Sequence, residues 1–215
     1  MKVSAQLKLM RQILQDPNAD RWERDSLLEF LNLAQESMYR EIVEADESYF
    51  IAIQEYSVTP ALNDSLEFDL PSDCSKVKTV ERLTSGAPLP GAQVEFQNRN
   101  IGGINQSFSV LYTTGPVYYL RDDQIGIVGP STSYTLRLYY IKTPTDLDDL
   151  TDTSEIPVEH HRLMALYAGK LAMGTEGESL EPSLLQEFER MYQQFKTFLD
   201  GRKSQWPRYV NYIGD

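Results

Sequence analysis

Histidine and cysteine are scarce in this sequence, which has 2 His and a single Cys among its 215 residues. One cysteine, Cys74, cannot form an internal disulfide bond, so nothing in the sequence requires an oxidising compartment. A chain with so few histidines is poorly equipped for zinc binding or for histidine-based catalysis. The sequence therefore predicts no cofactor.

Positive charge is also in short supply, because 20 Lys and Arg face 32 Asp and Glu and leave a net charge of −12. Proteins hold nucleic acid by neutralising phosphates with cations, so the bulk surface is not expected to bind free duplex DNA. No segment approaches the roughly 18 consecutive apolar residues of a membrane helix. The first residues lack the apolar region and small-residue cleavage site of a secretory signal. We expect a folded acidic protein with no membrane partner.

Motifs that carry chemistry are missing. His160 and His161 are adjacent, and neighbours on a helix point about 100° apart, which favours a structural or surface role over a shared metal ion. The glycines match neither a dinucleotide-binding nor a P-loop pattern. Asp122 and Asp123 stand where a β-turn is expected, and Cys74 has no candidate base close in sequence. The sequence predicts a protein that is not an enzyme.

An acidic segment, residues 143–160, contains no Lys or Arg. Its carboxylates lack the spacing, the glycine and the closing glutamate of an EF-hand loop. A solvated acidic loop is therefore favoured over a calcium site, and the same residues form a candidate patch facing a channel or a partner. The candidates for this patch are Asp146, Asp148, Asp149 and Asp152.

Hydrophobic residues recur at helical spacing near both ends of the sequence. In the second predicted helix they form one apolar stripe of Leu27, Leu31, Ala34, Met38 and Ile42. The opposite, polar face of that helix is predicted to carry Glu29, Gln35, Glu36, Arg40 and Glu41. Asp20 followed by Glu23 predicts an N-terminal capping pair for the second helix. Gly201 is the predicted C-cap of the last helix. The predicted helices are 2–14, 21–45, 157–173 and 182–199.

Between these helices the period changes to alternation, as in Tyr134, Leu136 and Leu138 against Thr135 and Arg137. Alternation with β-branched and aromatic residues is typical of half-buried strands. The polar stretch 92–107 is expected to form an exposed loop or hairpin. The predicted strands are 48–60, 65–71, 76–83, 108–112, 117–120, 124–128 and 134–141.

These elements predict an α+β fold. A helical bundle is built from both chain ends, 1–49 and 143–200, and it carries an inserted antiparallel β lobe, 50–142. An extended C-terminal arm, 201–215, follows the last helix.

The C-terminal arm combines aromatic and basic residues, types that are enriched at binding hot spots. It either packs back on its own bundle or docks on another subunit or partner. The second interpretation makes it a segment that becomes ordered on contact. Its candidate docking residues are Arg202, Lys203, Trp206, Arg208, Tyr209 and Tyr212.

Several segments, in their order and spacing, resemble the head-to-tail connector proteins of tailed bacteriophages, the adaptors beneath the portal ring. They span most of residues 20–200, and each alone is a structural turn or cap. They are LLEFLNLAQESMYREI (27–42), SLEFDLPSDCSKVKTV (65–80), VYYLRDDQIGIVGPSTSYTLRLYYIKTPTDL (117–147) and TDTSEIPVEHHRLMALYAGKLAM (151–173).

The resemblance implies a structural virion protein at the neck between capsid and tail. Such adaptors form a homo-oligomeric ring, commonly of about twelve copies, under the portal protein. They extend the DNA channel and carry tail or nozzle proteins, and their C-terminal segment reaches the portal. That segment corresponds here to residues 201–215, and the family has no catalytic residues to transfer. An anionic lining would let DNA pass without specific binding.

Other interpretations remain open at this stage. The chain could be another neck or virion component, such as a stopper, a tail-completion factor or a head-decorating protein. A carbohydrate-binding module with the Tyr-rich β lobe as its platform is a further alternative, as is a small bacterial regulatory protein.

Overall fold

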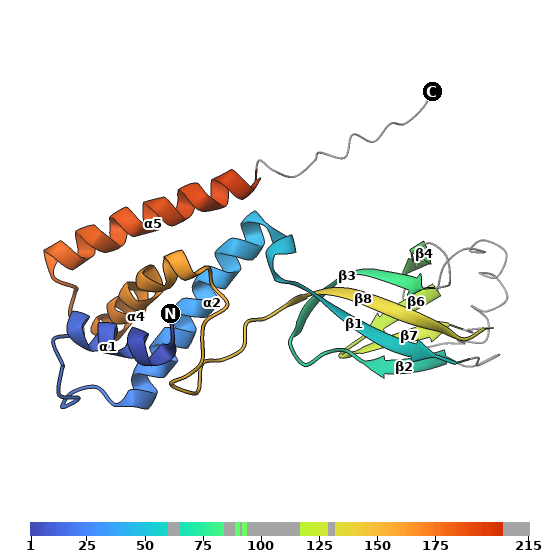
Figure 1. Cartoon of the computed structure of the whole chain (residues 1–215), viewed down its shortest axis with the longest axis horizontal. Helices are drawn as coiled ribbons and strands as arrows, with labels where there is room; N and C mark the ends of the chain where they lie inside the picture. The colour runs from blue at the N-terminus through green and yellow to red at the C-terminus, as the bar shows by residue number, and fades with distance from the viewer. Residues whose placement is uncertain (60–64, 84–88, 91, 94–116, 129–131, 204–215) are drawn as a thin grey trace, which may run out of the picture. The chain divides into compact units, whose positions relative to one another are not determined.

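The computed structural model describes residues 1–59, 65–83, 89–90, 92–93, 117–128 and 132–203 (Figure 1). Two compact units emerge. The helical unit combines Met1–Tyr49 with the chain from Pro144 onward, and the β unit is Phe50–Thr143. Helices come from both ends of the chain and the β unit is inserted between them, so the predicted α+β fold is confirmed. The predicted strand at 108–112 and most of the 92–107 loop lie outside the described residues.

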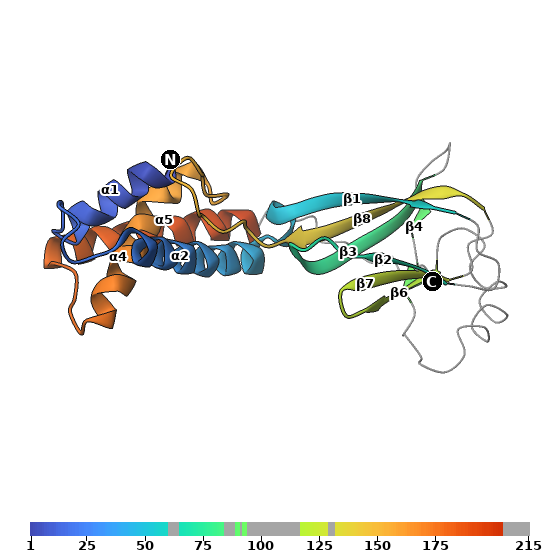
Figure 2. The same cartoon turned by 90° about the horizontal axis from the view of Figure 1, so that it is seen from below.

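In the helical unit, α4 packs against α1, α2 and α5 (Figures 1 and 2). This central place explains why α4 buries residues on nearly every side, including Leu163, Ala165 and Leu166 at 0% exposure. The helices are α1 Val3–Ile13, α2 Arg24–Ala45, α4 His161–Thr175 and α5 Pro182–Lys203, with short 3₁₀ turns η1 Glu47–Phe50 and η2 Val158–His160.

The apolar stripe predicted on α2 is its buried face. All five of its residues are at most 1% exposed. Burying side chains of this size contributes about 1.5–3 kcal/mol each, so the stripe is a main source of the bundle's stability. The stripe consists of Leu27, Leu31, Ala34, Met38 and Ile42.

The predicted start of α2 is wrong by three residues, and Asp20 is not its cap. The carboxylate of Asp16 accepts the backbone N–H groups of Asp20, Arg21 and Trp22 at 2.9, 3.3 and 3.0 Å. These bonds hold residues 20–22 in a turn, because their N–H groups are satisfied outside a helix. The helix therefore begins at Arg24.

The predicted C-cap at Gly201 is also wrong, because α5 continues to Lys203. Nothing lies within 4 Å of the position where a Cβ would stand on Gly201, so packing does not require glycine there. The extra turn is held by Arg202, whose contacts are described below.

The acidic segment returns the chain from the β unit to the helical unit and is bound along α2. Asn32 accepts the backbone N–H of Leu147 at 2.9 Å and donates to its carbonyl at 3.3 Å. Gln35 donates to the carbonyl of Thr145 at 2.9 Å. The backbone N–H groups of Val3 and Ser4 bond carbonyls of the same segment at 2.9 and 3.0 Å. One stretch of chain thus ties α1 to α2.

The described strands of the β unit form two four-stranded sheets, in the orders β1-β8-β3-β4 and β2-β7-β6-β5. Pairing is antiparallel throughout except between β5 and β6, which are parallel. The predicted strand at 48–60 starts too early, because residues 47–50 form η1. The strands are β1 Ile51–Val58, β2 Ser65–Asp69, β3 Cys74–Leu83, β4 Leu89–Pro90, β5 Ala92–Gln93, β6 Val117–Arg121, β7 Gln124–Val128 and β8 Tyr134–Lys142.

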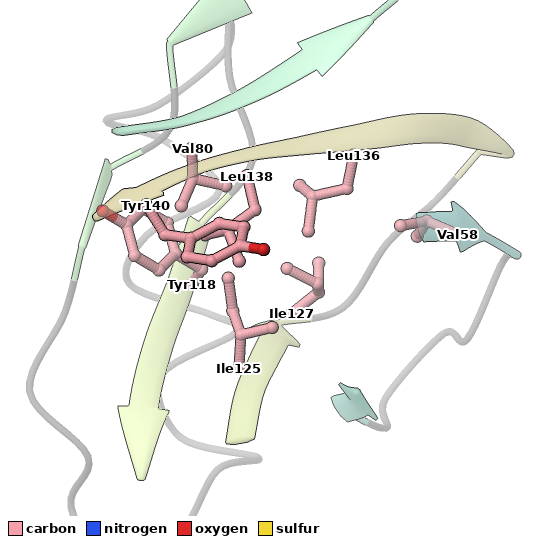
Figure 3. Close-up of a cluster of buried hydrophobic side chains, with 8 residues drawn as sticks. All are labelled: Val58, Val80, Tyr118, Ile125, Ile127, Leu136, Leu138 and Tyr140. Carbon is pink, nitrogen blue, oxygen red and sulfur yellow. The ribbon is translucent and has the colours of Figure 1, made fainter. Parts of the chain in front are cut away.

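The core of the β unit lies between these two sheets (Figure 3). Leu136 and Leu138 of β8 are fully buried and point toward Ile125 and Ile127 of β7. Thr135 and Arg137, at the alternate positions of β8, are only partly buried. The predicted alternation is therefore confirmed, and it fixes which face of β8 is covered.

One glycine is required for packing in this unit. Gly126 of β7 pairs directly with Tyr119 of β6, and a Cβ on Gly126 would lie 2.1 Å from the Tyr119 ring. The ring lies across the glycine, and its hydroxyl donates to Glu67 of β2 at 2.7 Å. The tyrosine thereby links three neighbouring strands.

Replacing Gly126 with alanine should therefore displace the Tyr119 ring and break its bond to Glu67. We expect Gly126→Ala to lower the free energy of unfolding by about 1–3 kcal/mol, the usual cost of overpacking. Urea unfolding monitored by tyrosine fluorescence measures the change. Gly174→Ala is the control, because nothing lies within 4 Å of its added Cβ. Equal effects of the two substitutions would contradict this role for Gly126.

Candidate functional site

The last turn of α5, where the C-terminal arm begins, is attached to the end of α2. Arg202 Nη1 donates to Asp46 Oδ2 at 3.0 Å. The Arg202 guanidinium also lies 4.6 Å from the ring centre of Tyr49 and 4.7 Å from that of Phe198. Stacked cation–π contacts of this kind contribute about 0.5–2 kcal/mol each.

Asp46 is well placed to hold this cation, because it is the C-cap of α2 and is 8% exposed. Its other oxygen, Oδ1, accepts the backbone N–H and the hydroxyl of Ser48. Both carboxylate oxygens are thus bonded, one to the turn that leads toward β1 and one to α5. Because the Asp46 side chain is only 10% exposed, removing Arg202 would leave a poorly hydrated carboxylate and would cost more than breaking a fully exposed ion pair.

Of the other candidate docking residues, only Lys203 lies within the described part of the chain. Lys203 is the last residue of α5. Trp206, Arg208, Tyr209 and Tyr212 lie outside the described residues.

The acidic patch predicted at 143–160 divides into two kinds of residue. Asp146, Asp148 and Asp149 are exposed. Asp152 is partly buried, and its Oδ2 accepts the backbone N–H groups of Asp148 and Asp149 at 3.0 and 2.8 Å. Asp152 therefore shapes the turn that presents the other carboxylates.

The outward face of α2 extends the acidic surface beside this segment. Exposed carboxylates recur every four to eight residues along it, with Leu33 at 49% exposure among them. Arg24, at the start of α2, donates to the carbonyl of Asp148 at 2.9 Å, so the two surfaces are contiguous. The predicted polar face includes Glu29 and Glu36, and Asp25 and Glu44 lie on the same face at helical spacing although they were not predicted there. The exposed α2 acids are Asp25, Glu29, Glu36 and Glu44.

Two residues predicted on the polar face of α2 have other roles. Gln35 is 2% exposed and holds the acidic segment, as described above. Glu41 pairs with Lys196 of α5 at 2.6 Å and accepts the hydroxyl of Tyr192 at 2.9 Å. These contacts fasten α5 along α2 at a second point beyond Arg202.

Both histidines are structural. The His160 ring meets Phe195 and Phe198 edge-on, with centroids 4.9 Å from each. His161 is 2% exposed, and its Nε2 lies 2.7 Å from the carbonyl of Ile156, which requires a proton on that nitrogen. Within the described part of the chain, no three His, Cys, Asp or Glu residues gather closely enough to hold a metal ion.

Comparison with known proteins identifies the family. The model of the SU10 adaptor protein family matches residues 4–211. The chain belongs to this family. Its members are phage adaptor proteins, so the predicted resemblance to connectors is confirmed and the role is that of a structural virion component. The search of curated proteins found no match. None of the described helices has the length and apolar character needed to cross a membrane.

Because His160 is buried, the stability of this adaptor is expected to depend on pH. Burial lowers the pKa of His160 from its ordinary value of 6.5, although Glu159 acts in the opposite direction. As pH falls through 6.5, the unfolded chain takes up a proton that the folded chain refuses, so stability declines toward pH 5. His160→Leu should make this decline shallower, because the side chain that titrates differently in the two states is gone. Unfolding of both proteins at pH 7.5 and 5.5 gives the comparison, and identical pH slopes would contradict it.

Proposed function

We propose that this adaptor forms a closed ring beneath the portal protein, where it extends the DNA channel and carries tail or nozzle proteins. The match to an adaptor family over residues 4–211 carries the proposal. A ring of identical copies needs two different faces on each copy that fit one another. The division into a helical unit and a β unit offers separate surfaces for neighbours and for tail proteins.

The C-terminal arm is the proposed contact with the portal. Helix α5 ends at Lys203, and the chain beyond it contains Trp206, Arg208, Tyr209 and Tyr212. Aromatic and arginine side chains provide most of the energy at protein interfaces. Two contact points, Arg202 with Asp46 and Lys196 with Glu41, fix the helix from which this segment leaves.

Deleting residues 204–215 should abolish binding to the portal protein of the same phage while the helical unit stays folded. The described contacts of α5 end before the deletion, so the thermal midpoint should stay within about 2 °C of the full chain. Pull-down or sedimentation with purified portal rings measures binding, and circular dichroism checks the fold. Undiminished binding by the truncated chain would exclude this segment as the contact.

The proposal also assigns the exposed acids a role in the channel. An anionic wall repels phosphates and so leaves DNA free to move. Asp146, Asp148 and Asp149 are exposed on one segment and adjoin the acidic face of α2.

Particles carrying lysine at all three of these positions should therefore release DNA more slowly, since cations bind phosphates in a salt-dependent way. The rate of triggered genome release in vitro, at low and high salt, is the measurement. Particles with asparagine at the same positions are the control for lost negative charge. Equal release rates for lysine and wild-type particles would place these residues away from the DNA path.

A further inference from the structure

Arg202 belongs by sequence to the C-terminal arm, but its guanidinium is engaged within its own subunit. It bonds Asp46 at 3.0 Å and stacks near Tyr49 and Phe198 at 4.6 and 4.7 Å. Its side chain retains only about a third of its exposure. A cation held from three sides has little surface left to offer a partner.

Two of the three residues that hold Arg202 come from the N-terminal part of the helical unit. Asp46 ends α2 and Tyr49 lies in η1, whereas Phe198 precedes Arg202 by one turn of α5. The end of a helix frays unless its last turn is tied down by contacts of this kind. Arg202 therefore fixes the last turn of α5, immediately before residues 204–215.

Fixing that point has an energetic consequence for binding. A segment that docks on a partner loses conformational freedom, and each residue that is ordered beforehand reduces this loss. If the last turn of α5 were frayed, its residues would also have to become ordered on binding, and this additional loss of conformational entropy would weaken binding. The clamp thus raises affinity without touching the partner.

We propose that Arg202 is a positioning residue, clamped by Asp46, Tyr49 and Phe198, that anchors the start of the portal-docking segment. This inference rests on the proposed function, because it assigns Arg202 a task in portal binding. It moves the boundary of the docking segment from residue 201 to residue 204.

The chemistry of the clamp requires arginine and not merely a positive charge. The planar guanidinium can bond a carboxylate while its faces lie against aromatic rings. A lysine ammonium at the same place could still reach Asp46 but would lose the stacked geometry. Arg202→Lys should therefore retain part of the effect, and Arg202→Ala none of it.

The test uses the full chain with two readouts, portal binding and hydrogen exchange of the backbone amides of residues 198–203. Arg202→Ala should speed exchange in this last turn and weaken portal binding about tenfold or more. Arg202→Lys should fall between Arg202→Ala and wild type, and Asp46→Asn should speed exchange in the same turn. Arg190→Ala removes an exposed cation from α5 and is the matched control, with no change expected in either readout.

The outcomes separate this inference from the proposed function. Wild-type binding by Arg202→Ala, together with lost binding on deletion of 204–215, would overturn the positioning role and leave the docking segment in place. Unchanged exchange of residues 198–203 in Arg202→Ala would overturn the clamp itself. Wild-type binding after the deletion would overturn the proposed contact, and the inference with it.

Discussion

The binding of the acidic segment along α2 is the long-range constraint that brings the two parts of the helical unit's sequence together. The β unit separates α2 from α4 in sequence. For the two helices to pack together, the chain that follows the β unit must be held against α2. Asn32 and Gln35 do this through bonds to the backbone of residues 145 and 147. Because the segment also bonds the start of α1, its loss would loosen α1 and α4 together.

The same segment connects the structure to its proposed function. Asn32 and Gln35 bond the backbone of this segment and fix its position on α2. Its aspartates Asp146, Asp148 and Asp149 remain exposed. Asp152 contributes by accepting N–H groups within the turn. An adaptor whose proposed task is to surround moving DNA needs a surface of fixed charge and shape, and both arise here from backbone bonds to α2.

Most of the fold could be predicted from the sequence because it follows from local periodicity. The stripe from Leu27 to Ile42 and the alternation of Leu136 and Leu138 each report one buried face, and the structure places them so. Two of the errors come from contacts between residues far apart in sequence, whereas the wrong start of α2 comes from the local bonds of Asp16 to residues 20–22. Gln35 is drawn inward by residue 145, and Gly201 stays helical beside Arg202, which reaches Asp46. No local pattern encodes such pairs. The acidic candidates were found from composition, whereas the turn-forming role of Asp152 needed coordinates.

The central proposal is that this phage adaptor forms a ring at the neck of the particle. Electron cryo-microscopy of the virion neck tests it most directly, because the two units have distinct folds that can be recognised in a density map. The account predicts a ring of copies between portal and tail, with the end of α5 directed toward the portal. Density for this chain on the head surface, or at the far end of the tail, would contradict it.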